Sequence, residues 1–386
     1  MFTHPAIAAS SGGFVESPAD GGRRSTTGSG RLIRRDRHAL DVYFLELGGE
    51  DDAFAAREAC NAAVDVDRVA PGVATAGSIQ PARVEGLAYT HRASRLLART
   101  DASVGSARAA LRAATLDRPT TVDGRQATVA VRARDVRGAT GVSTRDVERE
   151  LGAVLVDRGF AVDLDDPDHE LRAVFSEDTC LLGWLAVESV RDYGDRAPTD
   201  RPFFQPGGMA PLDARALANI AGAGPGTRLL DPMCGTGGVL LEAGLLGADV
   251  VGSDAQWKMA RGTRTNLDAY LDSGGGSASS GDDRAVGSFE VTRADATALP
   301  FRDDSFDATV FDVPYGRQSK IARHDLRDLI AGALSEAHRV APRAVVVADS
   351  PLRDVALDAG WLVDATFEQR VHGSLTRYTH VLTREP

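Results

Sequence analysis

The segment Asp312-Val313-Pro314-Tyr315 combines residue types that could act on an aromatic amine. It follows the apolar stretch 308–311, which we expect to be a strand, so Asp312 would lie at the carboxyl end of that strand. Pro314 favours a rigid, extended turn, which presents the Asp312 carboxylate and a main-chain carbonyl toward one point. Two acceptors on the hydrogens of a conjugated exocyclic amine draw its nitrogen toward tetrahedral geometry, while the Tyr315 ring can stack on the base. The pattern therefore predicts methylation of such a nitrogen.

A second candidate site is the loop Asp231-Pro232-Met233-Cys234-Gly235-Thr236-Gly237-Gly238, between a predicted strand at 228–231 and a predicted helix at 239–246. Glycines at such a turn let a ligand approach the backbone, and the start of the helix offers free N–H groups. The spacing matches neither the GxGxxG pattern nor the GxxxxGK[ST] phosphate loop, which disfavours dinucleotide and ATP sites.

Acidic residues also follow the next two predicted strands. Asp254 lies 23 positions beyond Asp231, at the end of the strand expected at 249–253, where it could accept both ribose hydroxyls of a nucleoside. Asp295, followed by Ala296, comes after the third strand, where an adenine amino group could be held. One acid after each of three successive strands favours a nucleoside site over chance.

Each pattern also has a simpler explanation. The glycine loop could be a tight turn of any α/β domain, and Asp312 could be the ordinary first residue of a type I turn. A dehydrogenase is a further alternative, but the glycine spacing is wrong for a dinucleotide pyrophosphate.

The composition limits the class of protein. The 386 residues are 43% hydrophobic and 26% charged, enough to fold into two or three domains. The longest apolar runs are only a handful of residues, such as 344–348, so we expect no membrane span and no exported leader. Cys60, Cys180 and Cys234 form no CxxC pair, so neither a zinc site nor a disulfide framework is expected, and the compartment should be a reducing cytoplasm.

The charged residues are unusual. The net charge is −11, lysine occurs only at 258 and 320, and all other basic residues are arginine. Aspartate strongly outnumbers glutamate. Short, hydrated carboxylates with almost no lysine suit a protein of a salt-accumulating halophile, although GC-rich coding would also favour arginine and aspartate.

The hydrophobic pattern predicts two architectures. In the front half we expect strands at 41–47, 126–133, 171–175 and 180–187, helices at 52–63, 101–114 and 144–157 (with Thr144 as N-cap), and an apolar periodic stretch at 84–100. In the back half, strands alternating with helices indicate a parallel sheet, with strands near 228–231, 249–253, 289–293, 308–312 and 344–348, and an antiparallel pair at 362–370 and 376–383. A Gly/Ser/Asp insertion at 274–287 should be a mobile surface loop.

The front half carries a basic stretch. Residues 92–134 contain nine arginines and three aspartates, within a chain that is otherwise strongly acidic. Such a stretch is typical of phosphate contact, the alternative being a chance cluster of solvated arginines. Lys258, Arg261 and Arg264 also share a face of a predicted helix, which we interpret as a solvated surface.

These motifs carry a resemblance. Residues 203–386 resemble the class I S-adenosylmethionine-dependent amino-methyltransferases, whose signature is [DN]-P-P-[YFW]; here valine stands at the second position. From about residue 41 the chain resembles the archaeal THUMP-domain tRNA (guanine-10-N2) methyltransferases. Three stretches carry that similarity: 201–211 (RPFFQPGGMAP), 231–238 and 312–317.

The resemblance implies an α/β fold, in which a Rossmann-like class I methyltransferase domain follows an α+β ferredoxin-like/THUMP module. The implied division is a disordered extension (1–38), a ferredoxin-like part (39–83), a THUMP-like RNA-binding domain (84–188), a linker (189–202) and the methyltransferase domain (203–386). The implied partner is tRNA, the implied methyl donor is S-adenosylmethionine, and no metal or membrane is expected.

The resemblance also implies residue roles. Asp231 and the glycine loop would hold the methionine end of the donor, Asp254 its ribose, and Asp295 with Ala296 its adenine. Asp312 and the Val313 carbonyl would take the guanine N2 amine, with Tyr315 stacking. The candidate donor-binding residues are Asp231, Cys234, Gly235, Thr236, Gly237, Asp254, Asp295 and Ala296, and the candidate catalytic residues are Asp312, Pro314 and Tyr315.

Two other functions stay open from the sequence. The same chemistry could serve another tRNA guanine, ribosomal RNA or DNA, because the acid-Pro-aromatic turn does not distinguish these amines. The chain could also be a non-catalytic RNA-binding module, against which the intact glycine loop and Asp312 argue.

Overall fold

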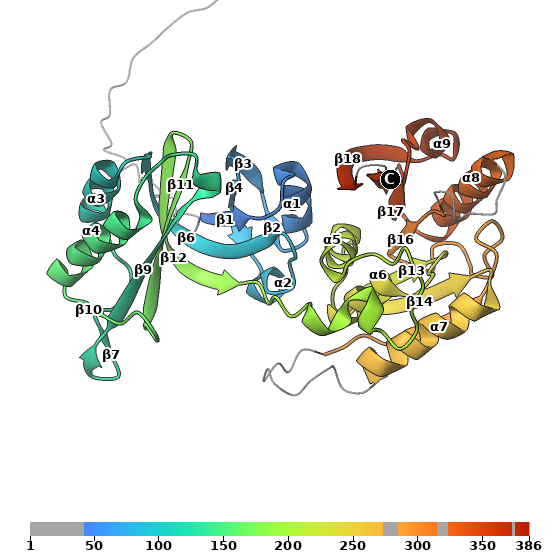
Figure 1. The fold of residues 1–386 in the computed structure, drawn as a ribbon, viewed down its shortest axis with the longest axis horizontal. Coiled ribbons are helices and arrows are strands. Elements are labelled where there is room, and N and C mark those ends of the chain that lie inside the picture. The colour runs from blue at the N-terminus through green and yellow to red at the C-terminus, as the bar shows by residue number, and fades with distance from the viewer. Residues whose placement is uncertain (1–41, 273–284, 315–322, 373–374, 386) are drawn as a thin grey trace, which may run out of the picture. The chain divides into compact units, whose positions relative to one another are not determined.

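The computed structural model describes residues 42–272, 285–314, 323–372 and 375–385, and all structural statements below concern these residues (Figure 1). The expected extension at 1–38, most of the insertion expected at 274–287, and Tyr315 lie outside them. None of the helices in the described ranges is both long and apolar enough to cross a membrane.

The front half is built on one eight-stranded sheet with the order β10-β9-β11-β12-β6-β1-β4-β3. Its strands are β1 (Tyr43–Leu47), β3 (Asp67–Ala70), β4 (Val73–Ala76), β6 (Thr90–Asp101), β9 (Thr128–Asp135), β10 (Ala161–Val162), β11 (His169–Ser176) and β12 (Thr179–Glu188). Its helices are α1 (Asp52–Ala59), α2 (Pro81–Val84), α3 (Val104–Ala113) and α4 (Thr144–Asp157), and two short hairpins pair β2 (Ala63–Val64) with β5 (Ser78–Ile79) and β7 (Thr121–Val122) with β8 (Arg125–Gln126).

Three hydrophobic cores pack on this sheet, and two of them include its helices. One lies between α3, α4 and the strands β9, β11 and β12, and contains the buried Val147, Leu151 and Leu155 of the expected inner face of α4. The other lies between α1, α2 and the strands β1, β4 and β6. The long strand β6 joins the two parts, because it pairs with β1 on one side and β12 on the other.

The predicted elements of the front half are present with shifted ends. The helix expected over 52–63 ends at Ala59, since residues 63–64 pair with β5 instead. The periodic stretch at 84–100 divides into the end of α2 and most of β6. The expectation that Thr144 caps α4 is wrong: the cap is Ser143, whose Oγ accepts a hydrogen bond from the Asp146 N–H at 3.3 Å.

The back half is a seven-stranded sheet with the order β15-β14-β13-β16-β17-β19-β18. The first five strands in this order are parallel, and β19 is antiparallel to both of its neighbours. The strands are β13 (Arg228–Asp231), β14 (Asp249–Asp254), β15 (Phe289–Arg293), β16 (Ala308–Asp312), β17 (Arg343–Ala348), β18 (Leu362–His372) and β19 (Leu375–Thr383), and the helices are α5 (Pro211–Ala221), α6 (Gly238–Leu245), α7 (Trp257–Leu267), α8 (Arg323–Val340) and α9 (Arg353–Asp358). The predicted parallel sheet and its closing antiparallel pair are confirmed.

The segment expected as a polar linker, 189–202, is packed against the back half. Arg196 and Arg201 are buried, and two short 3-10 turns, Gly194–Arg196 and Pro198–Asp200, shape the chain here. Arg196 donates to the fully buried Glu242 of α6 at 2.9 Å, and Arg215 of α5 donates to the same carboxylate at 2.8 Å. Polar composition suggested a solvated linker, but an interior carboxylate recruits these side chains because a buried charge needs charged partners.

We expect Glu242→Ala to lower the free energy of unfolding by about 3–5 kcal/mol, because it leaves two guanidinium groups buried without their carboxylate. Chemical unfolding at constant high salt measures this. The matched control is Asp303→Ala, which removes an exposed partner of Arg339 and should cost less than about 1 kcal/mol. Equal effects of the two changes would show that Glu242 is not the centre of this network.

Candidate active site

Three carboxylates meet at one edge of the back sheet. Asp254, Asp231 and Asp312 are the last residues of β14, β13 and β16, which lie side by side in that order and run parallel. The carboxyl ends of parallel strands share one edge, where α/β proteins bind ligands. The structure thus brings together three of the residues singled out in the sequence.

Asp231 is the most enclosed of the three. Its side chain is buried, and its Oδ1 accepts a hydrogen bond from the Met233 N–H at 3.0 Å. Burial raises the pKa of Asp231 well above its usual value, and the negative charges of Asp254 and Asp312 raise it further. A cationic ligand at this edge would offset that cost and favour the charged carboxylates.

Asp254 is tied to the glycine loop. Its two oxygens accept hydrogen bonds from the Gln256 N–H at 2.8 Å and from the Gly235 N–H at 3.2 Å. Partial burial raises its pKa, although these two backbone bonds act in the opposite direction. The acid is therefore oriented by the loop that it supports.

The glycine loop leads directly into α6. Gly235 and Gly237 have φ values of +54° and +78°, a region that strongly favours glycine, and Gly237 is the N-cap of α6 without a capping side chain. The first N–H groups of the helix are thus not covered by a side chain of the cap. This is the open, close-approach backbone that the sequence predicted.

The Cys234 side chain is enclosed beneath the glycine loop. It is buried, its Sγ lies 3.5 Å from Thr263 Oγ1, and burial raises its pKa well above its usual value. A Cβ at Gly252 would approach this sulfur to 3.3 Å. The thiol is thus part of the packing beneath the loop, and contact of Cys234 with a ligand stays a prediction.

Asp295 is placed differently from the other acids. It is exposed, and its Oδ1 accepts from the N–H and the hydroxyl of Thr297 at 2.9 and 2.8 Å, bonds that lower its pKa. The neighbouring Ala296 is buried. Contact of Asp295 with an adenine stays a prediction.

The turn after β16 is anchored on the neighbouring strand. The Val313 N–H donates to the Val347 carbonyl at 2.9 Å, and the Val313 side chain is buried. Pro314 is half-buried, whereas Tyr315 lies outside the described residues. The valine that replaces the first signature proline is held by an N–H bond that proline could not make.

Sequence reasoning missed the residues that hold the loop from below. Asn266 of α7 is buried and donates to the Thr236 and Phe203 carbonyls, each at 2.9 Å, while its own oxygen accepts from the Phe203 N–H at 2.8 Å. Thr263 donates its hydroxyl to the Gly235 carbonyl at 2.8 Å. Asn266 and Thr263 are polar residues on the inner face of α7, where they interrupt the apolar pattern. That interruption is the sequence feature that could have indicated these two residues.

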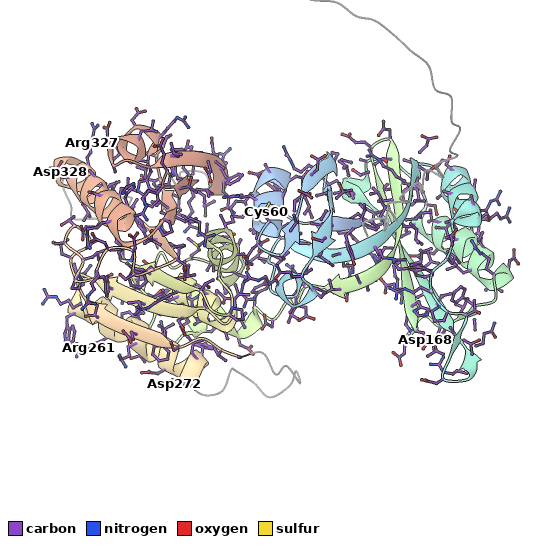
Figure 2. All side chains as sticks on the ribbon, turned by 180° about the vertical axis from the view of Figure 1, so that it is seen from behind. Cys60, Asp168, Arg261, Asp272, Arg327 and Asp328 are labelled. Atoms are coloured by element: carbon purple, nitrogen blue, oxygen red, sulfur yellow. The ribbon has the colours of Figure 1, made fainter. Side chains whose placement is uncertain are left out.

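The basic stretch of the front half is mostly neutralised. Six of its nine arginines form ion pairs, and five of their six partner acids lie outside 92–134; the pairs are Arg92–Glu188, Arg95–Asp117, Arg108–Glu150, Arg125–Asp168, Arg132–Glu170 and Arg134–Glu46. Asp168, labelled in Figure 2, accepts hydrogen bonds from both terminal nitrogens of Arg125, at 2.6 and 2.7 Å. The excess of arginine in this stretch is therefore not an equally large excess of free positive charge.

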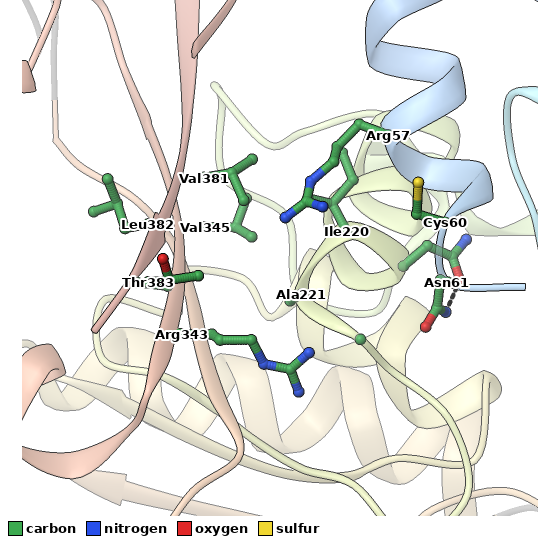
Figure 3. A pocket seen from close by; sticks show the side chains of 13 residues that line it. Arg57, Cys60, Asn61, Ile220, Ala221, Arg343, Val345, Val381, Leu382 and Thr383 are labelled. Carbon is green, nitrogen blue, oxygen red and sulfur yellow. Dashed lines mark hydrogen bonds between the residues drawn. The ribbon is translucent and has the colours of Figure 1, made fainter. Parts of the chain in front are cut away.

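A cavity of about 110 Å³ lies away from these acids (Figure 3). Its walls include Arg343 at the start of β17 and Thr383 at the end of the antiparallel β19. These residues mark the amino-terminal edge of the parallel strands, opposite the three acids. Within the described ranges, no group of three or more His, Cys, Asp or Glu side chains is placed to hold a metal ion.

Comparison with known proteins agrees with this architecture. A family model for the RMKL-like methyltransferase domain matches residues 198–379. The tRNA (guanine(10)-N2)-dimethyltransferase of Methanothermobacter thermautotrophicus is 37% identical over 261 residues, covering 66% of this chain and 73% of that protein. The enzyme of the same name from Pyrococcus abyssi is 30% identical over 244 residues, covering 62% and 69%. The mouse U6 snRNA (guanine-N(2))-methyltransferase THUMPD2 is 27% identical over 193 residues, covering 49% and 32%.

The parallel sheet with its antiparallel end, the glycine loop and the acids at the carboxyl edge define a class I methyltransferase. Within that class, the chain belongs to the family of the archaeal tRNA (guanine(10)-N2)-dimethyltransferases. The resemblance carried by the three sequence stretches is confirmed.

We expect Asp231→Asn to stabilise the ligand-free protein, and more so at pH 8 than at pH 5. An acid whose pKa is higher in the folded chain contributes stability that is complete below its unfolded pKa, about 3.9, and lost as the pH rises through the folded value. Asparagine keeps an oxygen that can accept the hydrogen bond from the Met233 N–H. It does not ionise, so it avoids this loss of stability, which is about 1.4 kcal/mol for each unit by which the folded pKa exceeds the unfolded one.

Thermal unfolding of both proteins across pH 5–8 measures the difference. Asp358→Asn, at an exposed acid of α9, is the control and should give a nearly constant difference. A stability gain for Asp231→Asn that does not grow with pH would contradict the raised pKa.

Proposed function

We propose that this protein transfers a methyl group from S-adenosylmethionine to the exocyclic N2 amine of a guanine in tRNA, guanine 10, giving N2-methyl- or N2,N2-dimethylguanosine. The observation that carries the proposal is the meeting of Asp231, Asp254 and Asp312 at one sheet edge, beside the glycine loop. The names of two relatives, which match 66% and 62% of this chain, support the same reaction.

The residues present fit the methyl donor. S-adenosylmethionine supplies an electrophilic methyl group on a positively charged sulfur. The edge carries three acids, and burial and the two neighbouring acids disfavour the charged form of Asp231. Such an edge suits a ligand that carries positive charge. Asp231, Gly235, Thr236 and Gly237, with the Cys234 backbone, would hold its methionine end, Asp254 its ribose, and Asp295 with Ala296 its adenine.

The chain's own residues would act on the amine. The Asp312 carboxylate and the Val313 carbonyl would accept hydrogen bonds from its two hydrogens and stabilise the positive charge that grows on nitrogen. Pro314 would keep the turn extended, and Tyr315 would stack on the guanine and fix it in line. A guanine paired within tRNA must first leave its stack, so binding elsewhere must contribute the energy for that step.

We assign RNA binding to the front half, as a ferredoxin-like part (39–83) followed by a THUMP-like domain (84–188). Since most arginines of the basic stretch are paired with acids, the exposed Arg99 and Arg112, for which the described residues provide no carboxylate partner, are the candidates for phosphate contact. A relative that acts on U6 snRNA matches only about half of this chain, which is consistent with the front half choosing the RNA.

We also propose that the protein works in the cytoplasm of a halophile. Its net charge of −11 and its near lack of lysine suit concentrated salt. Concentrated salt weakens nonspecific phosphate attraction by counterion competition, so arginine geometry and shape would contribute more of the RNA selectivity than bulk charge.

We expect Asp312→Ala to reduce methyl transfer by at least about a hundredfold, because it removes one acceptor for the reacting amine. Donor affinity should change little. Asp312→Asn is the matched variant: it keeps an acceptor oxygen, and the family signature allows it, so part of the activity should remain.

The assay that tests the function offers unmodified tRNA, ribosomal RNA and DNA in separate reactions with labelled donor in concentrated potassium chloride, followed by mapping of the modified nucleoside. Label at guanine N2 supports the proposal and mapping to position 10 supports the assigned site. Label only in ribosomal RNA, in DNA or at another tRNA guanine would establish the alternative substrates. Full activity of Asp312→Ala would remove this residue from the mechanism.

We expect Asp254→Ala to weaken binding of S-adenosylhomocysteine, the demethylated donor, by about 1–3 kcal/mol, the scale of a lost charged hydrogen bond. Titration calorimetry measures it. Asp254→Asn separates two effects, since it can still accept from the Gly235 N–H but lacks the charge for the ribose. Unchanged affinity in both variants would refute the ribose assignment.

A further inference from the structure

Arg201, the first residue of the stretch 201–211, has a buried guanidinium with unused hydrogen-bond donors. The residue is 3% exposed, and its Nε donates to the Arg196 carbonyl at 3.1 Å. Its Nη1 and Nη2 are enclosed and find no acceptor among the described residues. Native structures rarely leave charged donors in this state, so such a group is a candidate for a functional role.

The positive and negative side chains around Arg201 do not balance. Two other arginines, Arg196 and Arg215, share the Glu242 carboxylate, and Arg196 also pairs with Asp192 at 3.0 Å. Three guanidinium groups thus surround two carboxylates, and neither carboxylate is within pairing distance of Arg201. One unit of positive charge remains on Arg201.

That charge lies directly behind the glycine loop. A Cβ on Gly238, the first residue of α6, would approach Arg201 Nη1 to 2.8 Å. The same helix start has no capping side chain at Gly237, and its N–H groups carry partial positive charge. Asn266 fixes the distance between the stretch 201–211 and the glycine loop, since it donates hydrogen bonds both to the Phe203 carbonyl and to the Thr236 carbonyl. Two independent positive features therefore converge on one point.

We propose that Arg201 is a positioning residue that makes the glycine loop a receptor for the carboxylate of the methyl donor's methionine moiety. This inference rests on the proposed function. The enclosed guanidinium acts from behind the loop, where burial weakens the screening of its charge by solvent. The three acids at the sheet edge attract the cationic parts of the same ligand, so charge complementarity orients the donor with its carboxylate toward α6.

The test compares two ligands that differ in the carboxylate alone: S-adenosylmethionine and decarboxylated S-adenosylmethionine. Titration calorimetry at one fixed salt concentration gives the affinity ratio for each protein. We expect the natural chain to prefer the carboxylate form by about tenfold or more, the scale of a charge-assisted bond. Arg201→Gln should lower the ratio severalfold and leave the part that the N–H groups of α6 contribute, whereas Arg201→Lys, which keeps the charge, should retain most of the ratio.

Two further variants separate this role from simple destabilisation. Arg172→Gln removes a similarly buried arginine from the front sheet and should leave the ratio unchanged. If Arg201→Gln folds poorly, Arg201→Met gives the same comparison with an apolar side chain of similar length, which the interior tolerates better. An affinity ratio in Arg201→Gln or Arg201→Met that equals the ratio of the natural chain overturns the inference. Failure of the natural chain to bind either ligand would instead contradict the proposed function.

Discussion

The site depends on one electrostatic constraint: three parallel strands in the order β14-β13-β16 deliver three carboxylates to the same edge. Burial raises the pKa of Asp231 and of Asp254, and repulsion by Asp254 and Asp312 raises that of Asp231 further. Backbone N–H groups offset part of this cost: Met233 of the loop donates to Asp231, and Gly235 of the loop and Gln256 donate to Asp254. A ligand with positive charge at this edge relieves the remaining cost, so the feature that weakens the empty fold is the one that gives it affinity for a sulfonium compound.

A second constraint holds the loop in place. Glu242, one turn into α6, draws Arg196 from the connecting segment and Arg215 from α5 onto a single buried carboxylate. This fixes the chain that enters the methyltransferase half against the helix whose start forms the ligand loop. The connecting segment is therefore part of the site, and its position determines where the positive charge of Arg201 lies.

The front half shows how composition can mislead. Nine arginines between residues 92 and 134 suggest a basic surface, but acids from β1, β11, β12, α4 and the turn before β11 neutralise most of them. Those acids are distant in the sequence and become neighbours only when the eight strands pair. On α7, by contrast, Lys258, Arg261 (labelled in Figure 2) and Arg264 stay exposed, as the helical spacing predicted.

The sequence by itself determined the alternation of strands and helices in the back half, the glycine loop with its acids, and the acid-Val-Pro turn, because these are local patterns of hydrophobicity and backbone conformation. It could not determine strand order, since the side-by-side placement of Asp254, Asp231 and Asp312 follows from pairing between distant segments. Nor could it show that Cys234 turns inward, that Asn266 supports the loop, or that Arg201 lacks a carboxylate partner. Burial and ion pairing are properties of the packed chain, and only the tertiary structure decided them.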